Sequence, residues 1–376
     1  MEPKTELQQL RRGIDNVNAG MVQLFQERQR ISNEIARVKE QGNLAITDAG
    51  REIEVIETAA EQADEDKRAE TAALMRTLIS LSKLRQYETL GLTHALDFPP
   101  SGGKTDGPVA FQGLAGAWSE HAARQLFPGR ELANLEYFED VFDAVKSGAA
   151  VYGVLPIENS RTGAIGEVYD LLRRNACYIV GEMWIGVAQC LLGPPGASLG
   201  DVREVFSHPE GFSQCRRFLK NKNWELTDVR NTAVAAELVA ERASAKLAAI
   251  GSRRAAEVYG LTVLQPSIAD DLKNRTRFIA IAAQPVYDEA SDTVAVTFST
   301  PHQSGALCSV LQAFQLAGLN LTRIESRPVS NDKYRFFADL EANLLDPKAR
   351  DAIGQASMQS EYFEILGCYA ASKERT

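Results

Sequence analysis

The chain has 376 residues, of which 44% are hydrophobic and 24% are charged. One hydrophobic core stops growing at roughly 250 to 300 residues, so this length predicts two or three domains, and the composition excludes a wholly disordered chain. Lysine and arginine total 41 against 50 aspartates and glutamates, and the resulting net charge of −9 disfavours binding to nucleic acid or to an anionic membrane.

The cysteines and histidines show no spacing that would build a metal site. The five cysteines are scattered, odd in number and without a C-x-x-C pair, which predicts neither a disulfide framework nor a thiolate site. The amino terminus lacks the features of a signal peptide, and no stretch approaches the ~18 apolar residues of a membrane span. We therefore expect a cytoplasmic protein that uses neither a metal nor another cofactor.

The first forty residues are predicted to form one long helix. Apolar residues recur at alternating spacings of three and four from Leu7 to Val38, which is a heptad seam. Arg28 lies in this seam, where a guanidinium needs an anion from a ligand or a protein carboxylate unless it snorkels out to water. Arg11 and Lys39, 28 residues apart, are separated by about 42 Å on a straight helix. They share a ligand only if two copies pair antiparallel, so an intertwined dimer is expected.

Two further helices are predicted, one from about residue 48 and one ending at about residue 89. Their apolar stripes end in polar side chains that would point inward. Each polar residue alone is typical of a solvated helix surface, but together they offer cations, a carboxylate and an amide to one buried polyanion. These residues are Asp48, Arg51, Glu52, Ser82 and Gln86.

The pattern across these helices resembles the all-helical class of chorismate mutase. It consists of Leu10-Arg11, Glu27-Arg28, Lys39, Asp48, Arg51-Glu52, Ser82 and Gln86. The resemblance implies a one-step pericyclic rearrangement of a dicarboxylate, with Arg11 donated by a partner subunit. It implies that Arg11 and Arg28 bind the carboxylates. Lys39 and Gln86 would face the ether oxygen as the catalytic residues, and Glu52 would bind the hydroxyl. The other implied chorismate-binding residues are Asp48, Arg51 and Ser82.

Residues 93–107 are rich in glycine, proline and other turn formers and predict a linker after a first domain of residues 1–92. Gly103-Lys104-Thr105 is similar to the end of a phosphate-binding loop. That motif requires a glycine where Phe98 stands and a strand before it, so we reject this interpretation.

The middle of the chain repeats one local design, in which a short β-rich run leads through a turn into a helix pattern. This alternation predicts an α/β fold whose helix amino termini can bind anions. Ser119, Ser207, Thr232 and Ser252 stand at these turns, where each could equally be a helix cap. No G-x-G-x-x-G follows a strand, which disfavours a dinucleotide fold. The five runs lie at residues 109–111, 151–155, 205–206, 229 and 249–250.

Motifs at these turns resemble those of prephenate dehydratase over residues 108–284. They are Gly113-x-x-Gly116-x-x-Ser119, Pro156-Ile157-Glu158-Asn159-Ser160, Ser207-His208-Pro209 with Gln214, Thr232-Ala233 and Thr276-Arg277-Phe278. The resemblance implies two α/β lobes with the substrate in the cleft between them. Ala117-Trp118 stands where the family usually has Thr-Phe, so no threonine hydroxyl acts there.

The resemblance also implies roles in the dehydration of prephenate, whose product is aromatic. Thr276 is the leading catalytic candidate. Glu158 is the rival general acid if burial raises its pKa, and otherwise a partly solvated loop carboxylate. The resemblance implies that the substrate carboxylates are bound by Arg277 and by the helix starts at Ser207 and Thr232. It implies that Asn159 and Gln214 orient the substrate. The other implied substrate-binding residues are Ser119, Ser160 and Phe278.

The last segment, residues 292–371, is predicted to have the ferredoxin-like order βαββαβ, beginning with a strand at 293–298 and ending with one at 362–369. Two of its loops resemble the phenylalanine-binding motifs of ACT regulatory domains, although glycine and proline also serve ordinary turns. The implied effector residues are Gly305, Ala306, Leu307, Glu325, Ser326, Arg327 and Pro328.

The whole chain therefore resembles the bifunctional chorismate mutase–prephenate dehydratases. This implies conversion of chorismate to prephenate and of prephenate to phenylpyruvate with loss of water and CO2, inhibition by L-phenylalanine, and a homodimer or higher homo-oligomer. Three alternatives are a chorismate mutase–prephenate dehydrogenase, a dehydratase that uses arogenate, and a non-catalytic amino-acid sensor. The missing nicotinamide fingerprint disfavours the first.

Overall fold

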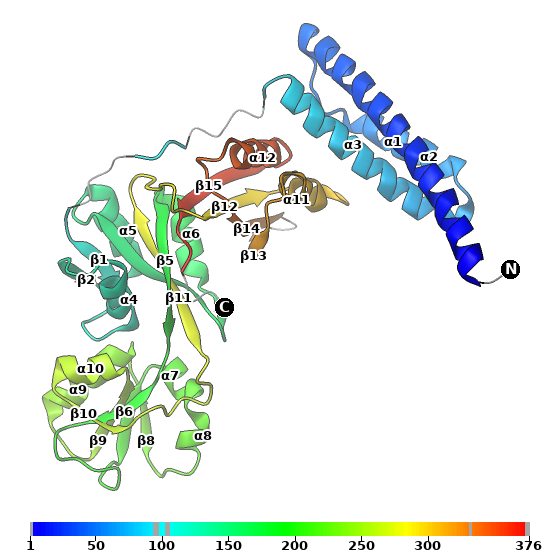
Figure 1. Ribbon diagram of the computed structural model, residues 1–376. Helices are drawn as coiled ribbons and strands as arrows, with labels where there is room; N and C mark the ends of the chain where they lie inside the picture. The colour runs from blue at the N-terminus through cyan, green and yellow to red at the C-terminus, as the bar shows by residue number, and fades with distance from the viewer. Residues whose placement is uncertain (1–2, 93–97, 102–105, 331–332, 373–376) are drawn as a thin grey trace. The chain divides into compact units, whose positions relative to one another are not determined.

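The computed structural model describes residues 3–92, 98–101, 106–330 and 333–372 (Figure 1). Residues 93–97 and 102–105 of the expected linker lie outside the described residues. In the part of the chain that the structure describes, no helix is both long and apolar enough to cross a membrane. Contacts divide the chain into two units, one of Met1–Asp97, Thr297–Leu340 and Leu344–Glu364, the other of Phe98–Val296, Glu341–Asn343 and Ile365–Thr376.

The first unit begins with the three predicted helices, which are confirmed. α1 is one continuous helix of 39 residues, as its heptad pattern indicates. The Asp48 side chain caps α2 by accepting a hydrogen bond from the backbone N–H of Arg51. Both α1 and α2 pack on α3. The bounds are α1 Pro3–Gln41, α2 Ala49–Gln62, a short 3-10 helix Glu65–Lys67 and α3 Arg68–Thr89.

The carboxy-terminal segment has the predicted order of elements. β13 and β14 pair antiparallel, and α11 packs against α12. Gly305 begins α11 with a φ of +86°, a left-handed conformation that favours glycine. The elements are β12 Thr293–Ser299, α11 Ala306–Ala317, β13 Leu321–Ser330, β14 Lys333–Glu341, α12 Pro347–Met358 and β15 Tyr362–Tyr369.

The second unit contains two α/β lobes, which confirms the expectation of an α/β domain. In the sheet of the first lobe the strand order is β5-β11-β3-β1-β2, with β4 also paired to β3. β1 runs parallel to β2 and β3, whereas β11 runs antiparallel to β3 and β5. Its elements are β1 Val109–Gln112, α4 Trp118–Leu126, β2 Leu132–Leu135, α5 Phe138–Ser147, β3 Tyr152–Asn159, β4 Gly163–Ala164, α6 Gly166–Asn175, β5 Tyr178–Gly186 and β11 Arg275–Ala282.

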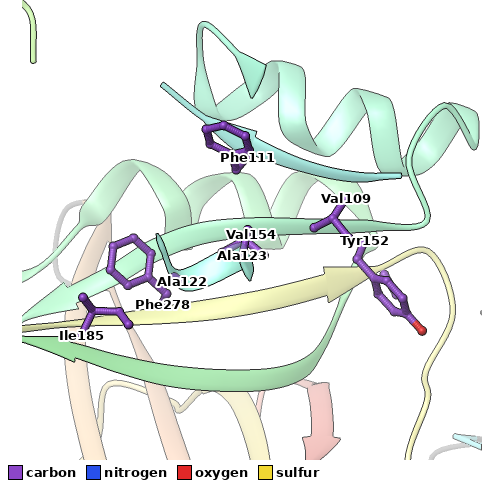
Figure 2. Packing of buried hydrophobic residues seen from close by; sticks show 9 residues of the cluster. Val109, Phe111, Ala122, Ala123, Tyr152, Val154, Ile185 and Phe278 are labelled. Atoms are coloured by element: carbon purple, nitrogen blue, oxygen red, sulfur yellow. The ribbon is translucent and has the colours of Figure 1, made fainter. Parts of the chain in front are cut away.

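The core of this lobe lies between the sheet and α4. Val109, Phe111, Val154 and Phe278 are buried there and pack with small alanines of α4 (Figure 2). Burial of this apolar surface fixes which face of β11 points to the core.

The second lobe has its own sheet, in the order β10-β6-β9-β7-β8. β7 lies parallel to both β8 and β9, and β6 is antiparallel to β9 and β10. The elements are β6 Cys190–Gly193, β7 Glu204–Ser207, α7 Pro209–Gln214, α8 Arg216–Leu219, β8 Glu225–Asp228, α9 Thr232–Arg242, β9 Leu247–Gly251, α10 Arg253–Tyr259 and β10 Thr262–Gln265.

Candidate functional sites

A cavity of about 310 Å³ lies among α1, α2 and α3 and brings together most of the residues expected to bind chorismate. Apolar residues of the three helices form the rest of its wall. The expected residues that line it are Arg28, Lys39, Asp48, Arg51, Glu52, Ser82 and Gln86.

Arg28 enters this cavity half-buried and bonded only to neutral oxygens. Its guanidinium donates to the Leu78 carbonyl at 2.7 Å and to the Ser82 hydroxyl. Burial lowers the pKa of the guanidinium from its usual value, because the charged form loses water. Among the described residues it has no carboxylate partner, so its charge is available to an anionic ligand.

Lys39 and Gln86 present further donors. The Lys39 ammonium donates to the Ile46 carbonyl at 2.5 Å, and Gln86 Nε2 donates to the Ser32 hydroxyl at 3.0 Å, which leaves both groups with N–H bonds to spare. Gln86 is only 7% exposed, so a bond from it to a ligand would form away from water.

Arg11 does not line the cavity. It lies on the exposed amino-terminal half of α1. Because α1 is one continuous helix, the helical rise separates Arg11 from Lys39 by about 42 Å. The seam around it is exposed in a single chain, with Leu10 at 64%, Val17 at 59% and Leu24 at 74%. A single copy therefore lacks one of the expected cations.

Lys83 lines the same cavity although the sequence did not single it out. Its ammonium lies 3.2 Å from each carboxylate oxygen of Glu52. Lys83 follows Ser82 on α3 and lies three residues before Gln86, so helical periodicity places it beside this stripe.

A second polar cluster lies in the second unit, where β3 and β11 are paired. The Oδ1 atom of Asn159 accepts from the backbone N–H groups of Arg161 and Thr162, at 3.0 and 3.2 Å. Backbone N–H groups are donors only, so they fix the amide orientation. Asn159 Nδ2 consequently donates to Thr276 Oγ1 and to Asn274 Oδ1, both at 2.9 Å.

This arrangement restricts the direction of the Thr276 hydroxyl proton. The hydroxyl oxygen receives the Asn159 donor, so its own O–H bond points elsewhere, and among the described residues no acceptor for it is present. Thr276 is 9% exposed. The hydroxyl can therefore donate to a bound molecule in a site largely shielded from water.

Glu158 and Arg277 lie on the opposite face of this sheet from Thr276. Neighbouring residues of a strand point to opposite faces, and the register pairs Asn159 with Thr276 and Glu158 with Arg277. The structure therefore does not bring Glu158 or Arg277 together with Thr276. The expected roles of Glu158 in acid catalysis and of Arg277 in carboxylate binding stay predictions.

Arg277 is engaged in a buried ion pair. Its guanidinium lies 2.6 Å from Glu182 on β5, with side-chain exposures of 3% and 0%, and it also donates to the Tyr369 hydroxyl at 2.9 Å. Phe278, expected to touch substrate, belongs to the apolar core described above and is 2% exposed.

Two of the expected residues of the second lobe, Ser207 and Thr232, lie at the starts of its helices, and Gln214 is the last residue of α7. Ser207 is fully buried and donates to the Ile250 carbonyl, whereas His208 and Asn231 cap α7 and α9. A side chain at Gly211 would collide with Ser207 and would lie within 3.6 Å of Thr232, so these two residues approach each other around α7. Gln214 is oriented by Gln189, which donates to it at 3.0 Å.

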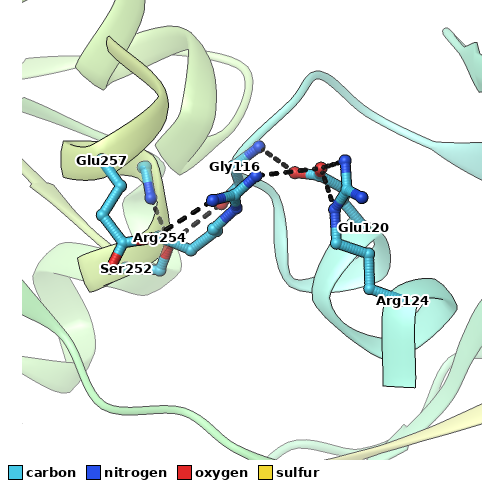
Figure 3. Close-up of polar contacts among 7 residues, drawn as sticks. Gly116, Glu120, Arg124, Ser252, Arg254 and Glu257 are labelled. Atoms are coloured by element: carbon cyan, nitrogen blue, oxygen red, sulfur yellow. Dashed lines mark hydrogen bonds and ion pairs between the residues drawn. The ribbon is translucent and has the colours of Figure 1, made fainter. Parts of the chain in front are cut away.

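The loop before α4 joins the two lobes. Gly116 has a φ of +86°, and a Cβ there would lie 2.8 Å from the Ala255 Cα, so the close approach requires glycine. The Ser252 hydroxyl donates to the Gly116 carbonyl at 2.9 Å and also caps α10 (Figure 3). Of the four residues that could equally have been helix caps, Ser252 is the one that caps its helix.

Glu120, which the sequence did not single out, anchors this loop. It is 2% exposed, accepts from the Gly116 N–H at 2.5 Å and from Arg124 at 2.7 Å, and lies 3.8 Å from Arg254 of the second lobe (Figure 3). The loop before α4 is thereby fixed against both lobes, and Ser119, which is 6% exposed, lies at the start of α4 directly after it. Ser160 lies beside the Asn159–Thr276 cluster, where its hydroxyl accepts a hydrogen bond from the backbone N–H of Arg275 at the start of β11.

The loop between β12 and α11 borders a smaller cavity of about 190 Å³. Gly305 and Leu307 line it together with Tyr334 and Phe336 of β14. The second expected effector motif lies on the neighbouring strand, where Ser326 pairs with Phe336 and Pro328 with Tyr334. Glu325 and Arg327 flank these positions on β13.

Comparisons with known proteins point to the same two activities. Residues 10–87 match the model of chorismate mutase type II, and residues 109–286 match that of prephenate dehydratase. The bifunctional chorismate mutase/prephenate dehydratase of Escherichia coli K12 is 31% identical over 98% of this chain and 97% of its own length.

Two other relatives cover the part of the chain after the helices. Arogenate dehydratase/prephenate dehydratase 1 of Arabidopsis thaliana is 38% identical over 69% of this chain and 71% of its own length. The solved structure of prephenate dehydratase from Arthrobacter aurescens in complex with L-Phe is 28% identical, covers 70% of this chain and 90% of its own, and has a TM-score of 0.64.

Proposed function

The chain belongs to the family of bifunctional chorismate mutase/prephenate dehydratases, and from this premise we propose that each candidate site performs one of the two reactions. The protein is a bifunctional enzyme of phenylalanine biosynthesis, an isomerase and a lyase. The observation that supports this most strongly is that each family model matches a separate part of the chain that contains its own candidate site. The proposed domains are residues 1–92, 108–284 and 292–371, with a linker at 93–107.

The helical site needs no nucleophile. A pericyclic rearrangement is accelerated by holding chorismate in its reactive conformer and by stabilising the charge that develops on the ether oxygen. Arg28 binds one carboxylate, Lys39 and Gln86 donate to the ether oxygen, and Glu52 accepts from the ring hydroxyl. Asp48, Arg51 and Ser82 complete the shell around the substrate.

Arg11 reaches this site from a second copy of the chain. The exposed apolar seam of α1 supports an intertwined homodimer, because burial of such a seam against its copy removes a large apolar area from water. Antiparallel pairing brings the amino-terminal half of one α1 beside the cavity of the other chain.

In the α/β site Thr276 acts as the proton donor. Asn159 donates to its oxygen and so both directs the hydroxyl proton toward the leaving hydroxyl of prephenate and stabilises the oxygen as the proton departs. Loss of CO2 and water yields aromatic phenylpyruvate, whose stability drives the step. With Arg277 engaged elsewhere, the helix starts near Ser119, Ser207 and Thr232 provide N–H groups for the carboxylates. Gln214 and Ser160 orient the substrate.

The carboxy-terminal segment is an ACT regulatory domain that binds L-phenylalanine. Gly305, Ala306 and Leu307, with the motif from Glu325 to Pro328, form the effector site. The L-Phe complex of the Arthrobacter enzyme supports this assignment. Millimolar phenylalanine is expected to lower the dehydratase rate, and an unchanged rate would contradict the assignment.

The enzyme is proposed to act in the cytoplasm. Its five free cysteines are consistent with that reducing compartment.

Arogenate is a second candidate substrate of the α/β site. The Arabidopsis relative carries both activities in its name, and the two substrates differ only in an amino group in place of a keto group. The ratio of kcat/KM for prephenate to that for arogenate, measured on one preparation, decides between them.

Separate assays of the two reactions test the proposal. Thr276→Val is expected to lower prephenate turnover by about 10²- to 10⁴-fold and to leave chorismate turnover unchanged. Arg28→Ala is expected to do the reverse, with at least a roughly thirtyfold loss of mutase activity. If either variant lost both activities while remaining folded, or if the protein bound both substrates without turnover, the assignment would fail.

A further inference from the structure

Lys83 lies in the mutase cavity in direct contact with a carboxylate of the site. Its ammonium is 3.2 Å from both oxygens of Glu52, so it straddles the carboxylate instead of touching one corner. The two side chains are 21% and 25% exposed. At this burial the pair is less screened by water and salt than a surface ion pair.

The charges that line the cavity give this pair a consequence for a dicarboxylate ligand. Arg51 already pairs with Glu54, which does not line the cavity, at 2.8 Å with both side chains more than 60% exposed. The charges left to the cavity of one chain are those of Arg28, Lys39 and Lys83 against those of Asp48 and Glu52. The net charge is one positive with Lys83 and zero without it.

We propose that Lys83 is a positioning residue of the mutase site. It holds the Glu52 carboxylate in place and offsets its negative charge. A dianionic substrate can then bind beside Glu52, which accepts a hydrogen bond from the substrate hydroxyl. The inference rests on the proposed function of this cavity and adds to it a residue that acts through Glu52.

A purely structural role would have different consequences. Lys83 also connects α3 to α2, and a lysine that only fixed these two helices would lower the stability of the helical domain and would change kcat as well as KM. A lysine that offsets Glu52 affects the binding of chorismate alone. Its effect also depends on the charge of Glu52 and on ionic strength, because added salt screens the repulsion that it normally cancels.

The test uses the full chain, with KM and kcat for chorismate measured for Lys83→Met and Lys83→Arg. Methionine keeps the length and removes the charge, so KM is expected to rise about tenfold with kcat changed less than about threefold. Lys83→Arg is expected to restore most of the affinity. In a Glu52→Gln background, Lys83→Met is expected to have little further effect on KM, since no charge remains to be offset. High salt is expected to shrink the KM difference between wild type and Lys83→Met.

Two controls separate the outcomes. Lys67→Met removes a lysine paired with Asp66 at 2.7 Å outside the cavity and should leave KM unchanged. Circular dichroism and a thermal melt of each variant report whether its helical domain is folded. An unchanged KM in Lys83→Met, or an equal rise in the Glu52→Gln background, would overturn the inference. A wild-type chain that does not turn over chorismate would instead overturn the proposed function.

Discussion

The orientation of one amide decides the chemistry available to Thr276. Two backbone N–H groups hold Asn159 Oδ1, and this leaves Nδ2 as the group that faces the threonine. The sequence placed Asn159 and Thr276 in one site, but which of them donates follows only from the loop after β3. The role of Asn274 as the other acceptor of the same amide likewise became visible only in the structure.

Asn159→Asp tests this orientation with almost no change of shape. Aspartate keeps the acceptor for the two backbone N–H groups but replaces the donor by a second acceptor. The Thr276 proton would then turn toward the aspartate, and prephenate turnover is expected to fall by at least about a hundredfold while chorismate turnover stays unchanged. Parallel rate assays on the two substrates check this, and a variant with full dehydratase activity would refute the proposed direction of the proton.

The buried pair of Arg277 and Glu182 is expected to matter for stability. Glu182→Gln would leave the guanidinium buried without its counter-charge, which costs about 3–5 kcal/mol. Chemical denaturation of the full chain measures the loss. As a matched control, Glu88→Gln removes the partner of Arg85 at an exposed site and should change the free energy of unfolding by less than about 1 kcal/mol. Equal effects of the two changes would contradict the buried pair.

At the scale of elements, periodicity predicted most of the fold. The heptad seam predicted α1, the alternation of β-rich runs and helix patterns predicted an α/β fold, and the elements of the last segment predicted the βαββαβ order. The division of the α/β part into two lobes was implied by the resemblance to prephenate dehydratase. Periodicity does not identify the face of a strand that looks onto the cleft, because that depends on which strands become neighbours and in what register. The resemblance implied substrate roles for Glu158 and Arg277, whereas the register places both on the face of the sheet that also carries Glu182.

Packing also determines which helical charges belong to a site. Lys83 and Glu120 read in the sequence as ordinary charged residues on helix surfaces. Only the packing of α3 against α2, and of the loop before α4 against α10, gives them their partners. The sequence signal that could have included Lys83 is its position on α3, four residues after Ile79 and three before Gln86.

The pairing of α1 with its copy can be tested by mixing defective chains. Arg11→Ala and Arg28→Ala should each lack mutase activity as homodimers. In a mixed dimer one site receives both defects and the other receives none. Co-refolded chains should therefore regain mutase activity at one of the two sites of each heterodimer. If each site used Arg11 and Arg28 of the same chain, mixing would restore nothing.

At the scale of the molecule, two active sites of different chemistry reside on one chain. In the proposed mechanisms the helical site depends on positive charge in a cavity, whereas the α/β site depends on one directed proton. No described residue that lines the helical cavity belongs to the Asn159–Thr276 cluster. The two activities should therefore be lost separately by point substitutions and should occur in sequence in the wild type.

The most direct test is to give the purified wild-type chain chorismate alone and to follow chorismate, prephenate and phenylpyruvate with time. We predict that chorismate disappears, that prephenate rises and then falls, and that phenylpyruvate accumulates to the amount of chorismate consumed. Consumption of chorismate that stops at prephenate, or no consumption at all, would contradict the assignment of both reactions to this chain.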